Sequence, residues 1–180
     1  MPVALLMIVL SQAADSHPVP PFAPRNVSAG VMVGQGAVSL QARLGWEVGL
    51  LEQPRNHLLA IAQVGSAFAI ATPAGIRALY QHVALFGLAY QMPLKHFSWG
   101  FGIGFGPLWY RAAYAPGLPY FFESRVLGYT EGRVEVGFKL GEVMKLGAAI
   151  GYASPVSFSQ RFPANSYVGG VMFSVVCNWR

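Results

Sequence analysis

Histidine is the side chain best suited to move protons near neutral pH, and the 180-residue sequence contains four histidines. His17 lies in a proline-rich segment, and His57 and His96 lie near expected turns, so we expect all three to be exposed. His82 falls in the middle of an expected strand, and its side is ambiguous because neither face of that strand is clearly polar. The histidines alone therefore predict no catalytic residue.

Other chemical motifs are sparse in this sequence. Cys177 is the single cysteine, so no internal disulfide forms, and no Cys-x-x-Cys or Cys/His cluster is present to hold zinc. The glycines near residues 100–106 alternate along an expected strand and do not form a phosphate-binding loop. No run of basic residues interleaved with aromatic residues suggests nucleic acid as a partner. We therefore expect no metal, no cofactor and no nucleic-acid partner.

The composition indicates the solvent in which the chain folds. Apolar residues make up 54% of the sequence and charged residues 11%, whereas an average soluble domain carries about 25% charged residues. Seven acidic and twelve basic side chains are too few to coat a soluble globule of this size. The composition excludes disorder and favours a lipid bilayer as the solvent.

The first residues indicate export. An apolar run at residues 3–10 is followed by Ser11-Gln12-Ala13, which places small residues where signal peptidase cleaves. No Lys or Arg precedes the run, so an ordinary buried strand is the alternative. We expect a signal peptide over residues 1–13, a proline-rich linker over 14–25 and one folded domain over 26–180.

The spanning elements follow a period of two and not 3.6. Between Phe97 and Trp109 every second residue is bulky or apolar, and four of the intervening residues are glycines. In a helix each such glycine costs about 1 kcal/mol relative to alanine, whereas a strand has one aromatic face and one bare face. The same alternation recurs over residues 38–50 and 125–140. Residues 58–76 carry no charge and are long enough for a transmembrane helix, which is the alternative.

Eight segments are expected to be strands: 26–33, 37–51, 57–71, 77–91, 96–110, 124–140, 144–154 and 166–179. An even number of antiparallel strands closes with both termini on one side, and closure leaves no unsatisfied edge in lipid. The two longest connections, 111–123 and 155–165, fall on the same side, an asymmetry typical of transmembrane barrels. We predict an all-β fold, an eight-stranded antiparallel up-and-down transmembrane β-barrel.

Aromatic residues mark two expected lipid interfaces. Trp99 and Trp109 are ten residues apart on one face, as are Tyr80 and Tyr90. Ten tilted strand residues span roughly 25 Å, the height of the apolar band of such barrels. We assign these four residues and Trp179 to the interfacial girdles. A soluble core of large rings is the alternative, and it would need the Lys, Glu and Thr surface that this chain lacks.

On these features the sequence resembles the small eight-stranded outer-membrane barrels of Gram-negative bacteria, of the OmpA or OmpX type. The resemblance covers residues 26–180 and rests on the alternation, the girdles, the loop asymmetry and the last strand. In that family the last strand ends in an aromatic residue that the assembly machinery recognises; here Arg180 follows Trp179. The resemblance implies an integral outer-membrane protein whose partners are membrane lipid, lipopolysaccharide and the assembly machinery.

Six charged residues are expected inside such a barrel: Arg43, Glu47, Glu131, Arg133, Glu135 and Lys139. Their formal charges cancel, and the bore of an eight-stranded barrel is just wide enough for side chains to fill. We therefore predict an ion-pair network that plugs the bore. A conducting pore would show one dominant sign of charge and a wider bore.

Three arginines, Arg111, Arg125 and Arg161, are expected at the extracellular rim. The planar guanidinium suits the phosphates of lipopolysaccharide, and solvated loop charges are the alternative. Some barrels of this size are lipid A deacylases with a His and Ser pair on the lipid face, but no His-x-Ser occurs in the closing strands. We therefore expect a protein without enzymatic activity, with a structural or surface-interaction role in the envelope. A narrow pore for small solutes and a lipid-modifying enzyme are the alternatives.

Overall fold

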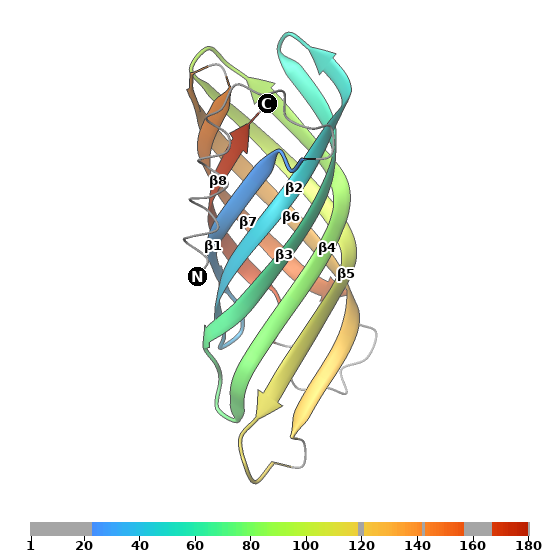
Figure 1. Ribbon diagram of the computed structural model, residues 1–180, viewed down its shortest axis with the longest axis vertical. Coiled ribbons are helices and arrows are strands. Elements are labelled where there is room, and N and C mark those ends of the chain that lie inside the picture. The colour runs from blue at the N-terminus through green and yellow to red at the C-terminus, as the bar shows by residue number, and fades with distance from the viewer. Residues whose placement is uncertain (1–22, 119–120, 142, 157–166, 180) are drawn as a thin grey trace.

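Eight antiparallel strands make up the sheet of the computed structural model, which describes residues 23–118, 121–141, 143–156 and 167–179. Each strand pairs with its neighbour in sequence, and β1 pairs with β8, so the sheet closes into a barrel (Figure 1). The strands are β1 (Asn26–Val33), β2 (Val38–Gln53), β3 (Asn56–Ala71), β4 (Ile76–Pro93), β5 (Phe97–Tyr114), β6 (Phe122–Leu140), β7 (Met144–Val156) and β8 (Gly170–Trp179). The expected signal peptide, most of the expected linker and Arg161 lie outside the described residues.

The predicted fold class is confirmed, and the helical alternative is wrong. Residues 58–76, which that alternative required, run along β3 and reach the start of β4. Among the described residues no helix is long and apolar enough to cross a membrane.

Two strand boundaries differ from the expected ones by four residues, and the others differ by at most two. β5 continues past Tyr110 to Tyr114, because Ala112 and Ala113 still pair with the beginning of β6. β8 begins at Gly170 and not at residue 166. Gly169 and Gly170 have φ angles of 88° and 132°, and this left-handed region interrupts an extended strand.

The alternation in sequence becomes an inner and an outer face. On β2, Gln41 and Arg43 are buried in the bore, while Leu40 and Ala42, which alternate with them, are exposed. On β5, Phe101, Ile103 and Phe105 are 50–60% exposed and point outward. A soluble core of large rings is therefore wrong, because these rings cover the outside of the barrel. The apolar outer face is the one that lipid covers.

The pairing of β4 and β5 is irregular near Gly106, where the two backbones approach closely. A Cβ atom on Gly106 would lie 1.9 Å from the carbonyl oxygen of Ala84, so only glycine fits there without a shift. Register pairs between the two strands are also interrupted between Val83–Leu108 and Phe86–Phe105. Pro107 lies in this gap and has no backbone N–H to donate to a neighbouring strand.

The connections distinguish the two ends of the barrel. The β2–β3, β4–β5 and β6–β7 connections contain at most three residues, whereas residues 115–121 and 157–169 join β5 to β6 and β7 to β8. Long loops of transmembrane barrels lie outside the cell. The end of the barrel near residues 71–76 and 114–122 is therefore the extracellular end, and the opposite end, where β1 begins and β8 ends, is periplasmic.

Candidate functional site

Polar side chains occur in two regions, the bore and one part of the outer wall. In the bore, Arg43 on β2 reaches across to β6, where its Nη1 donates to Oε2 of Glu131. Both side chains are almost fully buried. The Nη2 of Arg43 also donates to Oε1 of Gln41 at 3.0 Å and contacts Sδ of Met172 at 3.2 Å. The guanidinium is therefore held from three sides.

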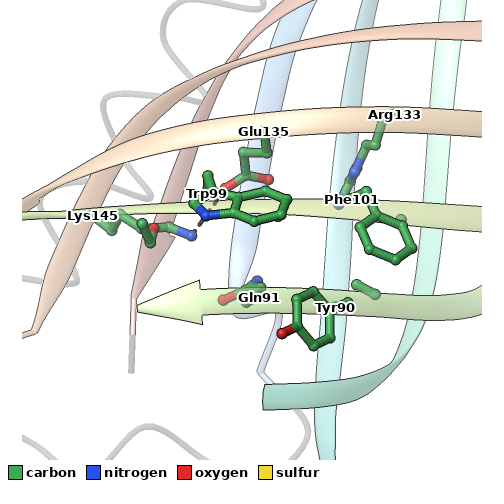
Figure 2. Close-up of a pocket in the computed structure, with 11 residues that line it drawn as sticks. Tyr90, Gln91, Trp99, Phe101, Arg133, Glu135 and Lys145 are labelled. Atoms are coloured by element: carbon green, nitrogen blue, oxygen red, sulfur yellow. Dashed lines mark ion pairs between the residues drawn. The ribbon is translucent and has the colours of Figure 1, made fainter. Parts of the chain in front are cut away.

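A second group of contacts lies at the periplasmic end of the bore. Nζ of Lys145 on β7 is 3.0 Å from Oε1 of Glu135, and Figure 2 shows this ion pair in a small pocket. Asn178 also donates to Glu135 at 2.9 Å, and Asn26 donates to Glu47 at 2.9 Å.

The six residues predicted to line the bore do not form one network. Arg43 contacts Glu131, while Glu135 is paired with Lys145, a residue outside the predicted set. Arg133 lines the pocket of Figure 2 and, like Lys139, makes no side-chain hydrogen bond or ion pair to a described residue. Of the predicted set, the structure thus pairs Arg43 with Glu131. It pairs Glu135 with Lys145, which was not predicted to lie in the bore.

Two tyrosines bind one carboxylate near the extracellular end of the bore. The hydroxyl groups of Tyr110 and Tyr114 on β5 both donate to Glu123 on β6. Tyr110 has no exposed surface, and Glu123 is 9% exposed. The described contacts in the bore join neighbouring strands (β1–β2, β5–β6 and β6–β7) and also strands that are not neighbours (β2–β6 and β6–β8).

The outer wall carries a serine and a histidine in direct contact. Ser66 on β3 and His82 on β4 are paired across the two strands. Oγ of Ser66 lies 2.8 Å from Nδ1 of His82, and both residues are exposed. The ring of His82 stacks on Trp109 of β5, with 5.0 Å between ring centroids and 15° between planes. Ser66, His82 and Trp109 therefore lie side by side on three adjacent strands.

The alternation of β3 and β4 places this pair on the lipid side. Val64 and Phe68 flank Ser66 on the outer face of β3, and Tyr80 lies two residues from His82 on β4. All three are 42–52% exposed. The side of His82, ambiguous from the sequence, is thus the outer one. Polar side chains that face lipid are unfavourable for folding. A hydrogen-bonded polar pair among apolar, lipid-facing residues is therefore a candidate functional site.

Trp109 is itself held in place. Its Nε1 donates to Oγ of Ser124 on β6 at 2.8 Å. Beyond it on β5, the guanidinium of Arg111 lies over the ring of Phe122, 5.4 Å from the centroid. The outer wall near the extracellular end therefore carries a patch formed by Ser66, His82, Trp109, Arg111 and Ser124, which we call the outer-wall patch.

The predicted girdle residues occupy different positions in the structure. Tyr80 and Trp109 are exposed on the outer face near the extracellular end. Tyr90 and Trp99 lie near the periplasmic end, with 6.3 Å between their ring centroids. Trp179 is 8% exposed and packs with Val27 and Cys177 instead of lying open on the outer face.

The arginines predicted to bind lipopolysaccharide do not share one face. Arg111 is opposite Ser124 across the β5–β6 pair and points outward. Arg125 is opposite Tyr110, whose side chain lies in the bore. Arg161 is outside the described residues. Joint binding of lipopolysaccharide by these three residues stays a prediction.

The contact between Ser66 and His82 has the arrangement of a nucleophile and its base. A serine hydroxyl is a weak nucleophile until an adjacent base accepts its proton, and a neutral imidazole within hydrogen-bond distance is such a base. Among the described residues, no carboxylate forms a hydrogen bond or ion pair with His82. The described residues also contain no group of three or more His, Cys, Asp or Glu that could hold a metal ion.

The sequence contained a signal for this pair that a search along single strands misses. His-x-Ser places two side chains on one face of one strand, whereas Ser66 and His82 lie on different strands. Both are eight residues from Ala74, which lies in the turn between β3 and β4. Residues equally distant from the centre of a hairpin turn become cross-strand neighbours.

The closed eight-stranded wall, its apolar outer face and its aromatic rings define the class of outer-membrane β-barrels, and the protein is integral to the outer membrane. A solved structure, the crystal structure of the outer membrane enzyme PagL, is similar with a TM-score of 0.56 and 14% sequence identity. The similarity covers 84% of this chain and 97% of that chain. No protein-family model matches the sequence, and no curated protein matches it.

This comparison corrects the functional expectation from the sequence. We expected a protein without enzymatic activity, but a solved barrel of similar architecture is an enzyme. The argument against an enzyme rested on the absence of His-x-Ser, and a Ser–His contact is present on the lipid face in another form.

Proposed function

We propose that this protein is an outer-membrane hydrolase that cleaves acyl esters of membrane lipids, with Ser66 as nucleophile and His82 as base. The observation that carries the proposal is the 2.8 Å contact between Oγ of Ser66 and Nδ1 of His82 on the lipid-facing wall. The likeness in fold to the outer membrane enzyme PagL supports the idea that a barrel of this architecture can be an enzyme.

The reaction proceeds by acyl transfer. Nδ1 of His82 takes the hydroxyl proton as Oγ of Ser66 attacks the ester carbonyl carbon, and the neutral histidine therefore carries its own hydrogen on Nε2. When the tetrahedral intermediate collapses, the ester C–O bond breaks and the departing alcohol receives the proton from His82. Water then attacks the acyl-serine with His82 again as base. The products are a free fatty acid and the deacylated lipid, and Ser66 is regenerated.

The position of the pair fits an ester of a membrane lipid. His82 is paired across the strands with Trp109, an exposed aromatic residue near the extracellular end. Aromatic girdles mark the boundary between hydrocarbon and headgroups, and the ester groups of lipids lie at this boundary. Further toward the membrane centre, Val64 and Phe86 are exposed on the same two strands and offer apolar contacts to acyl chains.

Labelling with a fluorophosphonate tests the nucleophile directly. Oγ of an activated serine forms a bond to phosphorus and fluoride leaves, whereas an ordinary serine stays unlabelled. We expect labelling of the purified barrel at Ser66, loss of label in Ser66→Ala and strong reduction in His82→Ala. Ser154→Ala is the matched control, because Ser154 is on β7 and its hydroxyl binds the carbonyl of Pro155 and no histidine.

Fatty-acid release provides the second measurement. The wild type, mixed with lipids extracted from outer membranes, should release fatty acids that mass spectrometry detects, and Ser66→Ala should release none above background. Each variant is first shown to be folded by its resistance to unfolding on a gel without heating. A wild type that neither takes the label nor releases fatty acid would overturn the proposed function.

A further inference from the structure

Two hydrogen-bond donors of the outer-wall patch have no acceptor among the described residues. The first is the Nε2–H of His82, because Nδ1 faces Ser66 and the ring face rests on Trp109. In serine hydrolases with a third catalytic member, a carboxylate accepts the hydrogen from this second nitrogen and holds the imidazole in the correct tautomer. No described carboxylate takes this role here.

The second donor is the guanidinium of Arg111. It points outward beside the ring of Phe122 and forms no hydrogen bond or ion pair with a described residue. A cation on the lipid face of a barrel is unfavourable unless it finds a partner or reaches the headgroups. Arg111 therefore has a charge that the described part of the protein does not neutralise.

Within the described ranges, the outer wall offers no acid for either donor. Of the described acidic residues, Glu47, Glu123, Glu131 and Glu135 face the bore, where each accepts a hydrogen bond. Glu52 is near the periplasmic end of β2. The anion that would complete the patch must therefore come from outside the described chain.

The register brings the two donors within reach of one small anion. His82 is opposite Trp109, and Arg111 is two residues farther along β5 on the same face. Diagonal neighbours of this kind have Cα atoms roughly 7–8 Å apart, and a phosphate placed between two such side chains can accept from both. The guanidinium is the cation best matched to phosphate oxygens.

We propose that the substrate carries a phosphate near the scissile ester, and that this phosphate binds Arg111 and accepts the Nε2–H of His82. The inference rests on the proposed hydrolase function and goes further, because it names the substrate class and a specificity residue. The lipid then supplies the acidic member that the wall lacks. An acyl ester without a phosphate leaves both donors without an acceptor and reacts slowly.

Pairs of substrates that differ only in phosphate provide the test. Phosphatidic acid is compared with diacylglycerol of the same acyl chains, and lipid A is compared with its dephosphorylated form, all in the same detergent micelles. For the wild type we expect hydrolysis of at least one phosphate-bearing member to be about 10- to 100-fold faster than that of its partner, the range for charge-assisted contacts. The pair that shows the preference distinguishes a glycerophospholipid from a phosphorylated saccharide lipid.

Two variants locate the preference. Arg111→Gln should bring the ratio close to one by slowing hydrolysis of the phosphate-bearing lipid. Arg55→Gln is the charge-matched control, because Arg55 is exposed in the β2–β3 turn at the opposite end of the barrel, and it should keep the wild-type ratio. A preference that survives Arg111→Gln would overturn the assignment of Arg111.

Binding to an inactive barrel separates this inference from the proposed function. Ser66→Ala should retain phosphatidic acid or lipid A during purification, and Ser66→Ala combined with Arg111→Gln should retain less. Equal hydrolysis of both members of each pair, or equal retention by these two variants, would overturn the inference while leaving the hydrolase intact. Absence of any hydrolysis and of any label at Ser66 would instead overturn the proposed function itself.

Discussion

The bore and the outer-wall patch use polar residues in opposite ways. In the bore, Arg43 binds Glu131 and Lys145 binds Glu135, so each of these charges is matched by a neighbour inside the same molecule. On the outer wall, Ser66 and His82 bind each other, but Nε2 of His82 and the guanidinium of Arg111 have no described acceptor.

This difference separates polar groups that stabilise the fold from polar groups that act on something else. The buried pair of Arg43 and Glu131 connects β2 with β6, which are not neighbours in the barrel, and removing one partner harms the fold. The outer-wall patch connects neighbouring strands that backbone hydrogen bonds already join. We therefore expect substitutions in the bore to change stability and substitutions in the patch to change activity.

Removal of the nucleophile should have the largest effect. Ser66→Ala should reduce lipid hydrolysis by at least about 10³-fold, because loss of the nucleophile of a catalytic set removes most of its rate enhancement. Denaturant unfolding of the detergent-solubilised barrel should be unchanged within error, since the lost hydrogen bond is on the outer surface. A large fall in the free energy of unfolding together with the fall in activity would show that Ser66 stabilises the fold, as the bore residues do.

Removal of Arg43 should produce the converse result. Arg43→Met leaves Glu131 buried without its partner, and we expect the free energy of unfolding to fall by about 3–5 kcal/mol, measured by urea denaturation. Activity per folded molecule should remain. Adding Glu131→Leu should recover much of the stability, and Arg133→Met should cost less, because Arg133 forms no hydrogen bond or ion pair with a described residue. Similar losses for Arg43→Met and Arg133→Met would show that packing and not charge pairing dominates there.

The stacking partner of His82 should have an intermediate effect. Trp109→Ala removes the ring that orients the imidazole, and an aromatic contact of about 0.5–1.5 kcal/mol corresponds to roughly a 3- to 10-fold loss of kcat/KM. Trp109→Phe keeps a stacking surface but loses the hydrogen bond to Ser124, so its loss should be smaller. Trp99→Ala, at the other girdle, should leave hydrolysis unchanged. Equal losses for Trp99→Ala and Trp109→Ala would point to a general effect on membrane anchoring.

The smallest effect is expected at the periplasmic end of the bore. Lys145→Met should lower the free energy of unfolding by about 1 kcal/mol, because this pair is partly open to solvent. Asn178 also continues to donate to Glu135. A loss of stability as large as that of Arg43→Met would contradict this expectation. It would show that the solvent exposure of an ion pair in the bore does not determine how much the pair contributes to the free energy of unfolding.

The alternation of side chains was sufficient to predict the strands, because a sheet between lipid and a filled bore sorts residues at every second position. The alternation could not predict which side chains meet across two strands, because that depends on the register of the strands. Ser66 and His82 meet because of the β3–β4 register, and Arg111 and Arg125 point to opposite faces because of the β5–β6 register. Lys145 was not among the charged residues expected in the bore, and nothing in β7 alone indicates an inward lysine.

The proposed catalytic pair, Ser66 and His82, lies on the convex outside of the barrel, and this position has a kinetic consequence. A lipid reaches Ser66 by lateral diffusion within the membrane plane and never enters a cavity. The concentration that governs the rate is therefore the mole fraction of substrate among the surrounding lipids. Diluting a micelle with inert detergent should slow hydrolysis, whereas diluting the whole solution with buffer at a constant lipid-to-detergent ratio should leave the rate per protein unchanged.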